Sequence, residues 1–266
     1  MPELPEVETI VRQLNQKIVG KTIEKVEILD KKLVDVKIKK ILPAKVLGVY
    51  RRAKSIIIEL ELKQFLLIHL RMTGHFHYLE KSSATPPDER FATSKFYFQD
   101  AVLTHSDIRR FGSIRLMNEE KLEKELAKLG VEPLSKEFTV QKLAELLGKK
   151  RKSNIKVVLM DQALVAGIGN IYAQEALYHA GISPLRKVGS LSLPEVKKLH
   201  EEIVRILELA VRNNGTTVDN YVHIEGSGGF QKYLAVYGLE KCPQGHKLIK
   251  MSLGGRGTSY CPVCQK

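Results

Sequence analysis

The chain has 266 residues, 43% of them hydrophobic, and its 43 Lys and Arg residues against 30 Asp and Glu residues give a formal net charge of +13. This length exceeds a typical single domain, so we expect two domains with a sizeable core. The basic excess favours a polyanionic partner such as nucleic acid, although many basic proteins bind none. No apolar run is long enough to cross a bilayer and the acidic N-terminus lacks a signal peptide's basic region, which predicts a cytoplasmic protein with no membrane partner.

The N-terminal stretch MPELPEVETI predicts a helix start. Pro5 suits a first helical turn, because its missing N–H costs nothing there, and the acidic residues that follow favour the helix dipole. We interpret Glu6 as a structural anchor of this turn. Apolar residues then recur at helical spacing, at Val7, Ile10, Val11, Leu14 and Ile18. Helix formation leaves Pro2 and Glu3 unexplained.

The next hundred residues predict strands and the rest of the chain mainly helices. β-Branched and apolar runs separated by turn residues occur at 21–30, 45–60, 65–74, 94–107 and 112–116. We expect a β-sandwich packed with the N-terminal helix. Helical patterns follow at 119–130, 139–150 and 190–215, with a linker at 130–138. In the longest helix, Ser192 is the expected cap, Glu195 completes a capping box and Gly215 is the stop.

All three cysteines lie in the last 25 residues, and an odd number suits a local metal site better than a disulfide framework. Two ligand pairs, Cys242-x3-His246 and Cys261-x2-Cys264, are separated by fourteen residues. Thiolates and an imidazole in two close pairs match the tetrahedral ligand set of one structural zinc ion. A two-residue spacing would be more usual in the first pair. The alternative is a degenerate finger with three thiols and a surface histidine.

Glycines interrupt a helical pattern in the middle of the second half. Residues 154–184 contain two helical patterns separated by AGIGN, and Asn170 begins the second. The exposed N–H groups of that helix start would bind a phosphate without reading sequence, but an ordinary helical hairpin with an asparagine cap accounts for the segment equally well. Further on, GGRGT places Arg256 at a hairpin tip whose backbone can approach a phosphate closely.

Several segments occur in the order and spacing of one known family: PELPEVET at the N-terminus, RRAK at 51–54, HLRMTG at 69–74, DIRRFG at 107–112, EPLS at 132–135, DQALVAGIGNIYAQEAL at 161–177 and GRGTSYCPVCQ at 255–265. Together they make the whole chain resemble the formamidopyrimidine-DNA glycosylase family, also called the Fpg/Nei superfamily. The resemblance implies an α+β enzyme with an N-terminal β-sandwich and flanking helix, a helix–two-turn–helix (H2TH) domain and a zinc-finger β-hairpin. It implies double-stranded damaged DNA as the partner and one structural Zn2+ as the cofactor.

The resemblance also predicts the division of the chain. We expect a catalytic β-sandwich domain over residues 1–131, a helical H2TH domain that binds DNA over 132–225, and the end of a lesion-contacting loop with the zinc-finger hairpin over 226–266. A monomer is the default expectation. In a prokaryote, the cytoplasmic protein would associate with the nucleoid.

The opening residues acquire a role from the resemblance. Methionine before proline is normally removed, so Pro2 would carry a free secondary amine with a usable neutral fraction. Attack of that amine on a sugar C1′ can form only a cationic iminium, which acidifies the C2′ proton and permits β-elimination after base excision. In the family, the residue that matches Glu3 protonates the opening deoxyribose, and the residue that matches Lys54 helps to activate the lesion and contacts its phosphate.

Base excision requires the damaged nucleotide to leave the stack, so other side chains must fill the gap. The family residues that do this match Met72, Arg109 and Phe111. Met72 and Phe111 would insert into the gap, and Arg109 would hydrogen-bond the base that has lost its partner. A methionine beside a strand is otherwise usually a core residue. Three further matches contact phosphate in the family, and we add Lys156 to them, giving the set His69, Lys156, Asn170 and Arg256.

The sequence departs from the family in two loops. The loop that would cover the flipped base, about residues 217–233, keeps Gly-Phe-Gln at 229–231 but reads VDN where an Arg-Asp pair is usual. We interpret residues 83–95 as a disordered loop. We predict a bifunctional DNA glycosylase and abasic-site lyase for oxidised purines, chiefly formamidopyrimidine and 8-oxoguanine. Two alternatives stay open: a glycosylase of the endonuclease VIII type for oxidised pyrimidines, and a zinc-containing protein that binds damaged DNA without cutting it.

Overall fold

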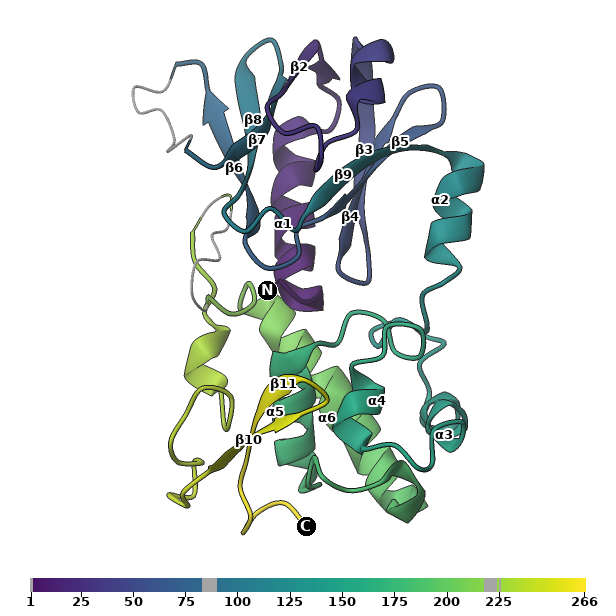
Figure 1. The fold of residues 1–266 in the computed structure, drawn as a ribbon, viewed down its shortest axis with the longest axis vertical. Coiled ribbons are helices and arrows are strands. Elements are labelled where there is room, and N and C mark those ends of the chain that lie inside the picture. Colours follow the sequence, from purple (N-terminus) through teal and green to yellow (C-terminus); the bar gives the residue numbers. More distant parts are fainter. Residues whose placement is uncertain (1, 83–89, 218–223, 225) are drawn as a thin grey trace. The chain divides into compact units, whose positions relative to one another are not determined.

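The computed structural model describes residues 2–82, 90–217, 224 and 226–266 (Figure 1). The chain forms two compact units, an N-terminal unit made of Met1–Ala127 and Asn214–Gly228, and a C-terminal unit made of Lys128–Asn213 and Gly229–Lys266. A β-rich unit and a helical unit with a small hairpin confirm the predicted α+β class. The three-part division of the chain stays a prediction.

Helix α1 spans Leu4–Ile18 and buries the face that its apolar spacing predicted. Val7, Leu14 and Ile18 are fully buried and pack into the core of the N-terminal unit. Pro5 lies in the first turn, as expected of a residue whose missing N–H would have had no partner there. The helix therefore begins directly after the first residues of the chain and holds them against the sandwich.

Two antiparallel sheets form the rest of the N-terminal unit (Figure 1). One has the strand order β1, β3, β4, β5, β9 and the other the order β2, β7, β8, β6. The strands are β1 Thr22–Ile23, β2 Lys25–Ile28, β3 Ala44–Arg52, β4 Ser55–Leu60, β5 Gln64–His69, β6 Gly74–Glu80, β7 Ala92–Tyr97, β8 Ala101–Asp107 and β9 Ser113–Asn118. A short 3-10 helix covers Val36–Lys40 and helix α2 covers Glu119–Leu126. Side chains of both sheets and of α1 share one core, which confirms the predicted sandwich.

Strand β6 is the element of this unit that the sequence did not predict. Its segment GHFHYLE contains two histidines and a terminal glutamate, so it lacks the run of apolar residues found in β4 and β5, yet it pairs along its whole length with β8. The interpretation of residues 83–95 as a loop is wrong at its end, because β7 already begins at Ala92. Residues 83–89 lie outside the described part of the chain.

The C-terminal unit contains four helices and a hairpin within its described residues. They are α3 Val140–Gly148, α4 Ile155–Leu159, α5 Asn170–Ala180 and α6 Leu193–Arg212, with short 3-10 helices at Val188–Ser190 and Phe230–Tyr233 and with strands β10 Ile249–Leu253 and β11 Arg256–Tyr260. Helix α6 packs on α5 and α3. Ser192 and Glu195 form its predicted capping box. No helix in the described ranges combines the length and apolar character that crossing a bilayer requires.

The buried carboxylate of Glu175 anchors a loop of the C-terminal unit to α5. Its two oxygens accept hydrogen bonds from the backbone N–H groups of Ala235 at 2.7 Å, Val236 at 3.1 Å and Tyr237 at 2.8 Å. Burial raises the pKa of this carboxyl, and the three N–H donors oppose that shift. The loop leads into the cysteine-rich tail, so Glu175 ties that tail to the helical core.

We expect Glu175→Gln to lower the free energy of unfolding by about 1 to 3 kcal/mol, because the new amide NH2 group would face a buried N–H and leave it unsatisfied. Urea unfolding followed by circular dichroism measures the change. Glu201→Gln, on the exposed side of α6, is the matched control and should stay within about 0.5 kcal/mol of wild type. Equal stability of the two variants would contradict this role.

His105 on β8 makes the N-terminal unit sensitive to acid. The side chain is fully buried, and burial lowers its pKa to about 4, with Asp107 opposing and His75 reinforcing the shift. An unfolded histidine has a pKa near 6.5, so at pH values between about 6.5 and 4 only the unfolded chain binds this proton. Stability therefore falls as the pH falls through that window.

We expect His105 to account for a loss of about 2 kcal/mol in unfolding free energy between pH 7.5 and pH 5. Urea unfolding of wild type and His105→Gln at both pH values isolates this contribution, because His69 and His179, whose pKa values are also lowered, remain in both proteins. A pH dependence that is the same in both proteins would show that His105 does not carry it.

Candidate functional site

The N-terminus of α1 holds two of the three candidate catalytic residues, Pro2 and Glu3. Glu3 is the N-cap residue and is 1% exposed, and its backbone N–H donates to Glu6 Oε2 at 2.9 Å. Glu6 Oε1 accepts the N–H of Thr216 at 2.7 Å. Gly215 approaches so closely, with a φ of +73°, that a Cβ there would lie 2.6 Å from Glu6 Oε1. Glu6 thus joins the backbone beside Pro2 to a second segment of the same unit, as a structural residue would.

Lys54 lies in the tight turn between β3 and β4. The turn requires Ala53 to adopt a left-handed conformation with a φ of +53°. Arg51 supports it by donating from one guanidinium nitrogen to the Ala53 carbonyl at 3.0 Å and from Nε to Glu8 of α1 at 2.9 Å. The lysine side chain is only 8% exposed. Arg51 and Glu8 therefore connect the lysine turn to the helix that begins next to Pro2.

His69 ends β5 opposite Ser55, the residue after Lys54. Burial lowers its pKa to about 4, and the nearby charges of Arg71, Lys54 and Arg115 act in the same direction. Its Nδ1 accepts the backbone N–H of Arg71 at 3.2 Å, which places the proton on Nε2. At neutral pH this side chain is an uncharged hydrogen-bond donor, a suitable partner for a phosphate oxygen.

Met72, Arg109 and Phe111 lie on two loops that leave the paired end of β6 and β8. Gly74 and Asp107 are partners in the register of these strands, so the loop before β6 and the loop after β8 start side by side. The Phe111 side chain is 56% exposed, and the Arg109 guanidinium lies over its ring at 4.9 Å from the centroid. An exposed aromatic ring with an arginine on its face has the shape and the donors to enter a DNA stack.

In the C-terminal unit, the start of α5 and the hairpin share a polar contact. The Asn170 side chain donates from Nδ2 to the Gly257 carbonyl at 3.1 Å, and Gln174 donates from Nε2 to the same carbonyl at 3.3 Å and accepts the N–H of Ser259 at 2.6 Å. Arg256 starts β11 after the Gly254–Gly255 turn and is exposed. The structure thus brings Asn170 and the strand that carries Arg256 together.

Lys156 occupies a different position from the other predicted phosphate contacts. Its side chain is fully buried, and its Nζ donates to Thr258 Oγ1 at 2.6 Å. This geometry supports the hairpin from inside the unit and gives Lys156 no exposed surface for a ligand.

Cys242, His246, Cys261 and Cys264 converge as the sequence predicted. One ligand atom from each of them lies within 4.8 Å of the others. Cys242 Sγ is 3.6 Å from His246 Nδ1 and 3.9 Å from Cys264 Sγ, and His246 Nδ1 is 3.3 Å from Cys264 Sγ. A tetrahedron with metal–sulfur bonds of about 2.3 Å has edges of about 3.8 Å, so the four side chains fit one zinc-sized ion.

The electrostatics of these thiols also suit a cation. Burial and the neighbouring thiols raise the pKa of Cys264 to about 11. Burial also opposes ionisation of Cys242, but the N–H groups of Gln244 and His246 and the Tyr178 hydroxyl outweigh it and lower that pKa to about 6. Several thiolates so close together repel one another, and a divalent cation would remove that repulsion. The cluster can therefore hold a metal ion.

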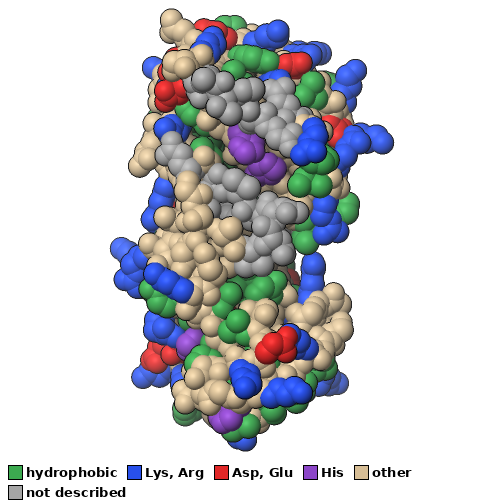
Figure 2. Space-filling model, turned by 90° about the vertical axis from the view of Figure 1, so that its left-hand side faces the viewer, with side chains coloured by type: hydrophobic (Ala, Val, Ile, Leu, Met, Phe, Trp, Pro, Cys, Tyr) green, Lys and Arg blue, Asp and Glu red, His purple; other side chains and the backbone are tan. Residues whose placement is uncertain are grey.

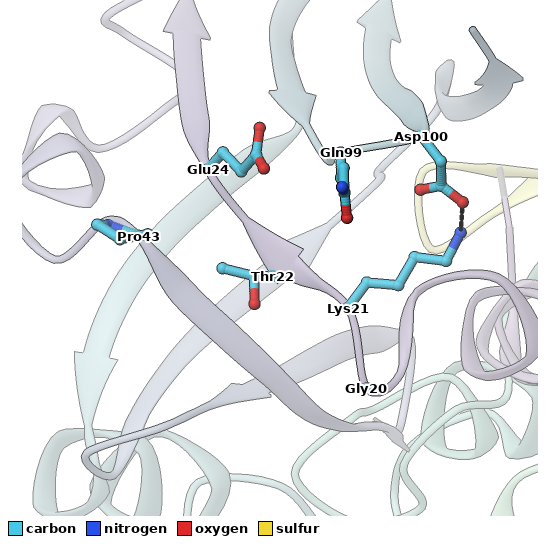
Figure 3. Close-up of a pocket in the computed structure, with 7 residues that line it drawn as sticks. All are labelled: Gly20, Lys21, Thr22, Glu24, Pro43, Gln99 and Asp100. Carbon is cyan, nitrogen blue, oxygen red and sulfur yellow. Dashed lines mark hydrogen bonds and ion pairs between the residues drawn. The ribbon is translucent and has the colours of Figure 1, made fainter.

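A polar cavity of about 760 Å³ elsewhere in the N-terminal unit contains none of the predicted site residues (Figure 3). Its lining includes Lys21, whose Nζ contacts Asp100 Oδ2 at 2.5 Å and Tyr78 at 2.8 Å, so the charge of this lysine is already paired. The basic surface is broader than any one cavity: on the face in Figure 2, Lys and Arg side chains are spread widely and Asp and Glu side chains are fewer.

Two family models match the chain: the formamidopyrimidine-DNA glycosylase N-terminal domain over residues 1–114, and the formamidopyrimidine-DNA glycosylase H2TH domain over residues 129–222. The chain belongs to the formamidopyrimidine-DNA glycosylase family. Its relatives include the formamidopyrimidine-DNA glycosylases of Carboxydothermus hydrogenoformans, 40% identical, and Brevibacillus brevis, 42% identical, each matched over 100% of this chain and at least 99% of its own length.

Solved structures of Lactococcus lactis Fpg have the same fold. A mutant form in complex with a Fapy-dG containing DNA has a TM-score of 0.93 and 35% identity, with 100% of both chains covered. The complex of the same organism's Fpg with an abasic site containing DNA has a TM-score of 0.92 and 35% identity over 99% of each chain. Our chain is therefore a DNA glycosylase of base excision repair, in a family characterised by abasic-site lyase activity.

Several residues of this glycosylase support the site and were not predicted from sequence. Arg51 and Glu8 hold the lysine turn, Gln174 holds the hairpin, and Asp107 accepts hydrogen bonds from the loop that carries Arg109 and Phe111. Asp107 stands inside the DIRRFG segment, so a local signal existed for it. Glu8, Arg51 and Gln174 also stand inside segments that carry the family resemblance. However, Arg51 contacts Glu8 and Gln174 contacts Gly257 across long stretches of sequence, so no local pattern shows what these residues hold.

Proposed function

We propose that this glycosylase excises oxidised purines, chiefly formamidopyrimidine and 8-oxoguanine, from double-stranded DNA and then cleaves the abasic strand through Pro2. The observation that carries the proposal is the Pro2–Glu3 pair at the buried cap of α1, with the Glu3 backbone fixed by Glu6. The names of the relatives and the lesion-containing DNA in the complexes of the Lactococcus lactis protein point to the same substrate class.

The chemistry starts from the amine of Pro2, which becomes free when the initiator methionine is removed. Its nitrogen lone pair forms a bond to the sugar C1′ as the bond from C1′ to the base breaks. The proton that the amine nitrogen loses passes to the departing base, so the base leaves in its neutral, protonated form. Glu3 donates a proton to the ring oxygen as the C1′–O4′ bond opens, and the C1′–nitrogen double bond of a cationic iminium forms. Loss of the C2′ proton then expels the 3′ phosphate by β-elimination.

Lys54 and His69 would contact the backbone of the damaged nucleotide in this proposal. They are neighbours at the ends of β4 and β5, and one is a cation while the other is a neutral donor. Met72, Arg109 and Phe111 would occupy the gap that the everted nucleotide leaves. Asn170 and Arg256 would bind a phosphate from the C-terminal unit. Lys156, being buried, would act by supporting the hairpin.

We further propose that Cys242, His246, Cys261 and Cys264 hold one structural Zn2+. All four positions of a tetrahedral ion would be taken by protein ligands, so such an ion supplies a cross-link and no reactive position. It would connect the two ends of the tail, whose hairpin strands are too short and exposed to be stable alone.

The test is borohydride trapping on duplex DNA with a single 8-oxoguanine opposite cytosine, beside a duplex with an oxidised pyrimidine, followed by mass mapping of the crosslinked peptide. We expect a covalent adduct on Pro2 and faster trapping on the 8-oxoguanine duplex. Faster trapping on the pyrimidine duplex would instead favour the endonuclease VIII type of substrate. Tight binding with no adduct on either duplex would favour a lesion-binding protein, and a retained Met1 would exclude the amine mechanism.

A further inference from the structure

The carboxylate of Asp107 joins the two loops that carry Met72, Arg109 and Phe111. We propose that Thr73 and Asp107 are positioning residues that hold these loops in the arrangement needed to fill the gap in the DNA stack. This inference rests on the proposed function, because it concerns the same nucleotide eversion. We call Thr73, Asp107 and the backbone N–H groups of Arg109, Phe111 and Gly112 the Asp107 network.

The Asp107 network uses both carboxylate oxygens. Oδ1 accepts the Thr73 hydroxyl at 2.6 Å and the N–H of Arg109 at 3.2 Å. Oδ2 accepts the N–H groups of Phe111 at 2.9 Å and Gly112 at 2.7 Å. The Arg109 N–H also donates to Thr73 Oγ1 at 2.9 Å. One side chain therefore binds three backbone groups of its own loop and the hydroxyl next to Met72 in the other loop.

The network is buried beneath the side chains that it holds. Asp107 is 1% exposed, whereas Phe111 is 56% exposed. The backbone N–H groups of the loop point inward to the carboxylate, so the Arg109 and Phe111 side chains can extend outward together. The Arg109 guanidinium then lies over the Phe111 ring, 4.9 Å from its centroid. Gly112 permits this fold, since a Cβ there would lie 3.0 Å from both Asp107 Oδ2 and the His69 carbonyl.

Arg110 of the same loop is held separately. Arg110 adopts a left-handed conformation with a φ of +55°, and its Nε donates to Asp30 Oδ2 at 2.7 Å. This pair fixes the path of the loop but makes no contact with the loop of Met72 among the interactions described. The connection between the two loops therefore runs through Thr73 and Asp107.

Order in these loops has a consequence for one step of the reaction. Side chains that are already in place lose less conformational entropy when they insert into DNA, by about 0.5 to 1.5 kcal/mol for each one. An intact base pair must be broken before its nucleotide can leave the stack, whereas a nucleotide with no base has no pair to break. Loosening the Asp107 network should therefore weaken binding wherever these side chains insert and should slow excision of a paired base. It should hardly affect the cleavage rate of an abasic site that is already bound.

The test compares Thr73→Val with Thr73→Ser and with Tyr78→Phe. Valine has the shape of threonine but no hydroxyl, and serine restores that hydroxyl. Tyr78→Phe is the control, because it removes one hydroxyl hydrogen bond, to Lys21, at the other end of the same β6–β8 pair. Single-turnover rates are measured for each protein on an 8-oxoguanine duplex and on a duplex with a preformed abasic site. Dissociation constants are measured for a duplex that contains a tetrahydrofuran analogue of the abasic site and for an undamaged duplex.

We expect Thr73→Val to slow base excision about tenfold, to leave abasic-site cleavage within about twofold, and to weaken binding of the tetrahydrofuran duplex about tenfold without a change on undamaged duplex. Thr73→Ser should restore wild-type values and Tyr78→Phe should keep them. Excision and cleavage that are unchanged, or lowered equally, in Thr73→Val would overturn the proposal. If the wild-type protein cuts neither substrate, the proposed function fails. The role of the Asp107 network is then tested by binding alone, and equal affinities of wild type and Thr73→Val for the tetrahydrofuran duplex would overturn it.

Discussion

Glu3→Gln is expected to lower the single-turnover rates of base excision and of abasic-site cleavage by about two to four orders of magnitude. A carboxylic acid can give its proton to the opening sugar and a carboxamide cannot. The substitution is nearly isosteric, and the backbone N–H of Glu3 keeps its acceptor on Glu6. The folded structure and the affinity for damaged duplex should therefore change little. Rapid-quench kinetics on an 8-oxoguanine duplex measure the first step, and a preformed abasic site measures the second.

The matched control is Glu24→Gln, which makes the same chemical change at an exposed position of the N-terminal unit away from the cap of α1. It should retain wild-type rates. A Glu3→Gln protein with rates within about threefold of the control would exclude Glu3 as the proton donor. In that case the buried position of Glu3 would reflect its capping of α1 alone.

Cys261→Ala is expected to abolish binding of the proposed zinc ion and to lower the affinity for damaged duplex about a hundredfold. Cys261 is fully buried and packs with Cys242, Val236 and Leu248, so its loss breaks both the ligand set and the small core around it. Structural zinc contributes on the order of 10 kcal/mol to the folding of small zinc domains, far more than two exposed five-residue strands supply. The hairpin that carries Arg256 would lose its fixed position.

Metal analysis by mass spectrometry and fluorescence anisotropy on a tetrahydrofuran duplex measure the two effects. Val263→Ala changes an exposed residue between two ligands, 51% exposed, and should keep one zinc ion per chain and wild-type affinity. Chelation of the wild-type protein should reproduce the loss, and added zinc should reverse it. Full affinity of a metal-free Cys261→Ala protein would show that the tail needs no ion to hold the hairpin.

Local patterns in the sequence predicted most of the secondary structure. The spacing of Val7, Leu14 and Ile18 predicted the buried face of α1, and Ser192 with Glu195 predicted the start of α6. These features depend on interactions between residues three or four positions apart, so a short stretch of sequence is enough to predict them. Strand β6 was missed because its stability comes from pairing with β8 and from packing on one face, which its own residues do not reveal.

The four candidate metal ligands were predicted because thiols and an imidazole in closely spaced pairs are typical of structural zinc sites, and the structure brings all four side chains together. The surroundings of Lys156 could not be read from the sequence in the same way. Its hydrogen-bond partners, Thr258 and Gly257, lie about a hundred positions away in the sequence, and they make it a buried donor inside the C-terminal unit. Its contact with DNA stays a prediction. A lysine's exposure depends on what packs over it, and the sequence around it does not contain that information.

The sequence by itself determined the family, the helix caps and the composition of the candidate metal site. The caps and each ligand pair depend on residues close together in the chain, and the family follows from the order and spacing of short motifs along it. The tertiary structure alone decided which of the chemically capable residues share a location. Glu6 reaches Thr216, Arg51 reaches Glu8, and Asp107 reaches Thr73 only after the sandwich has formed. Directional hydrogen bonds require donor and acceptor within about 3 Å, and distances at that scale between remote residues are set by the packing of the whole unit.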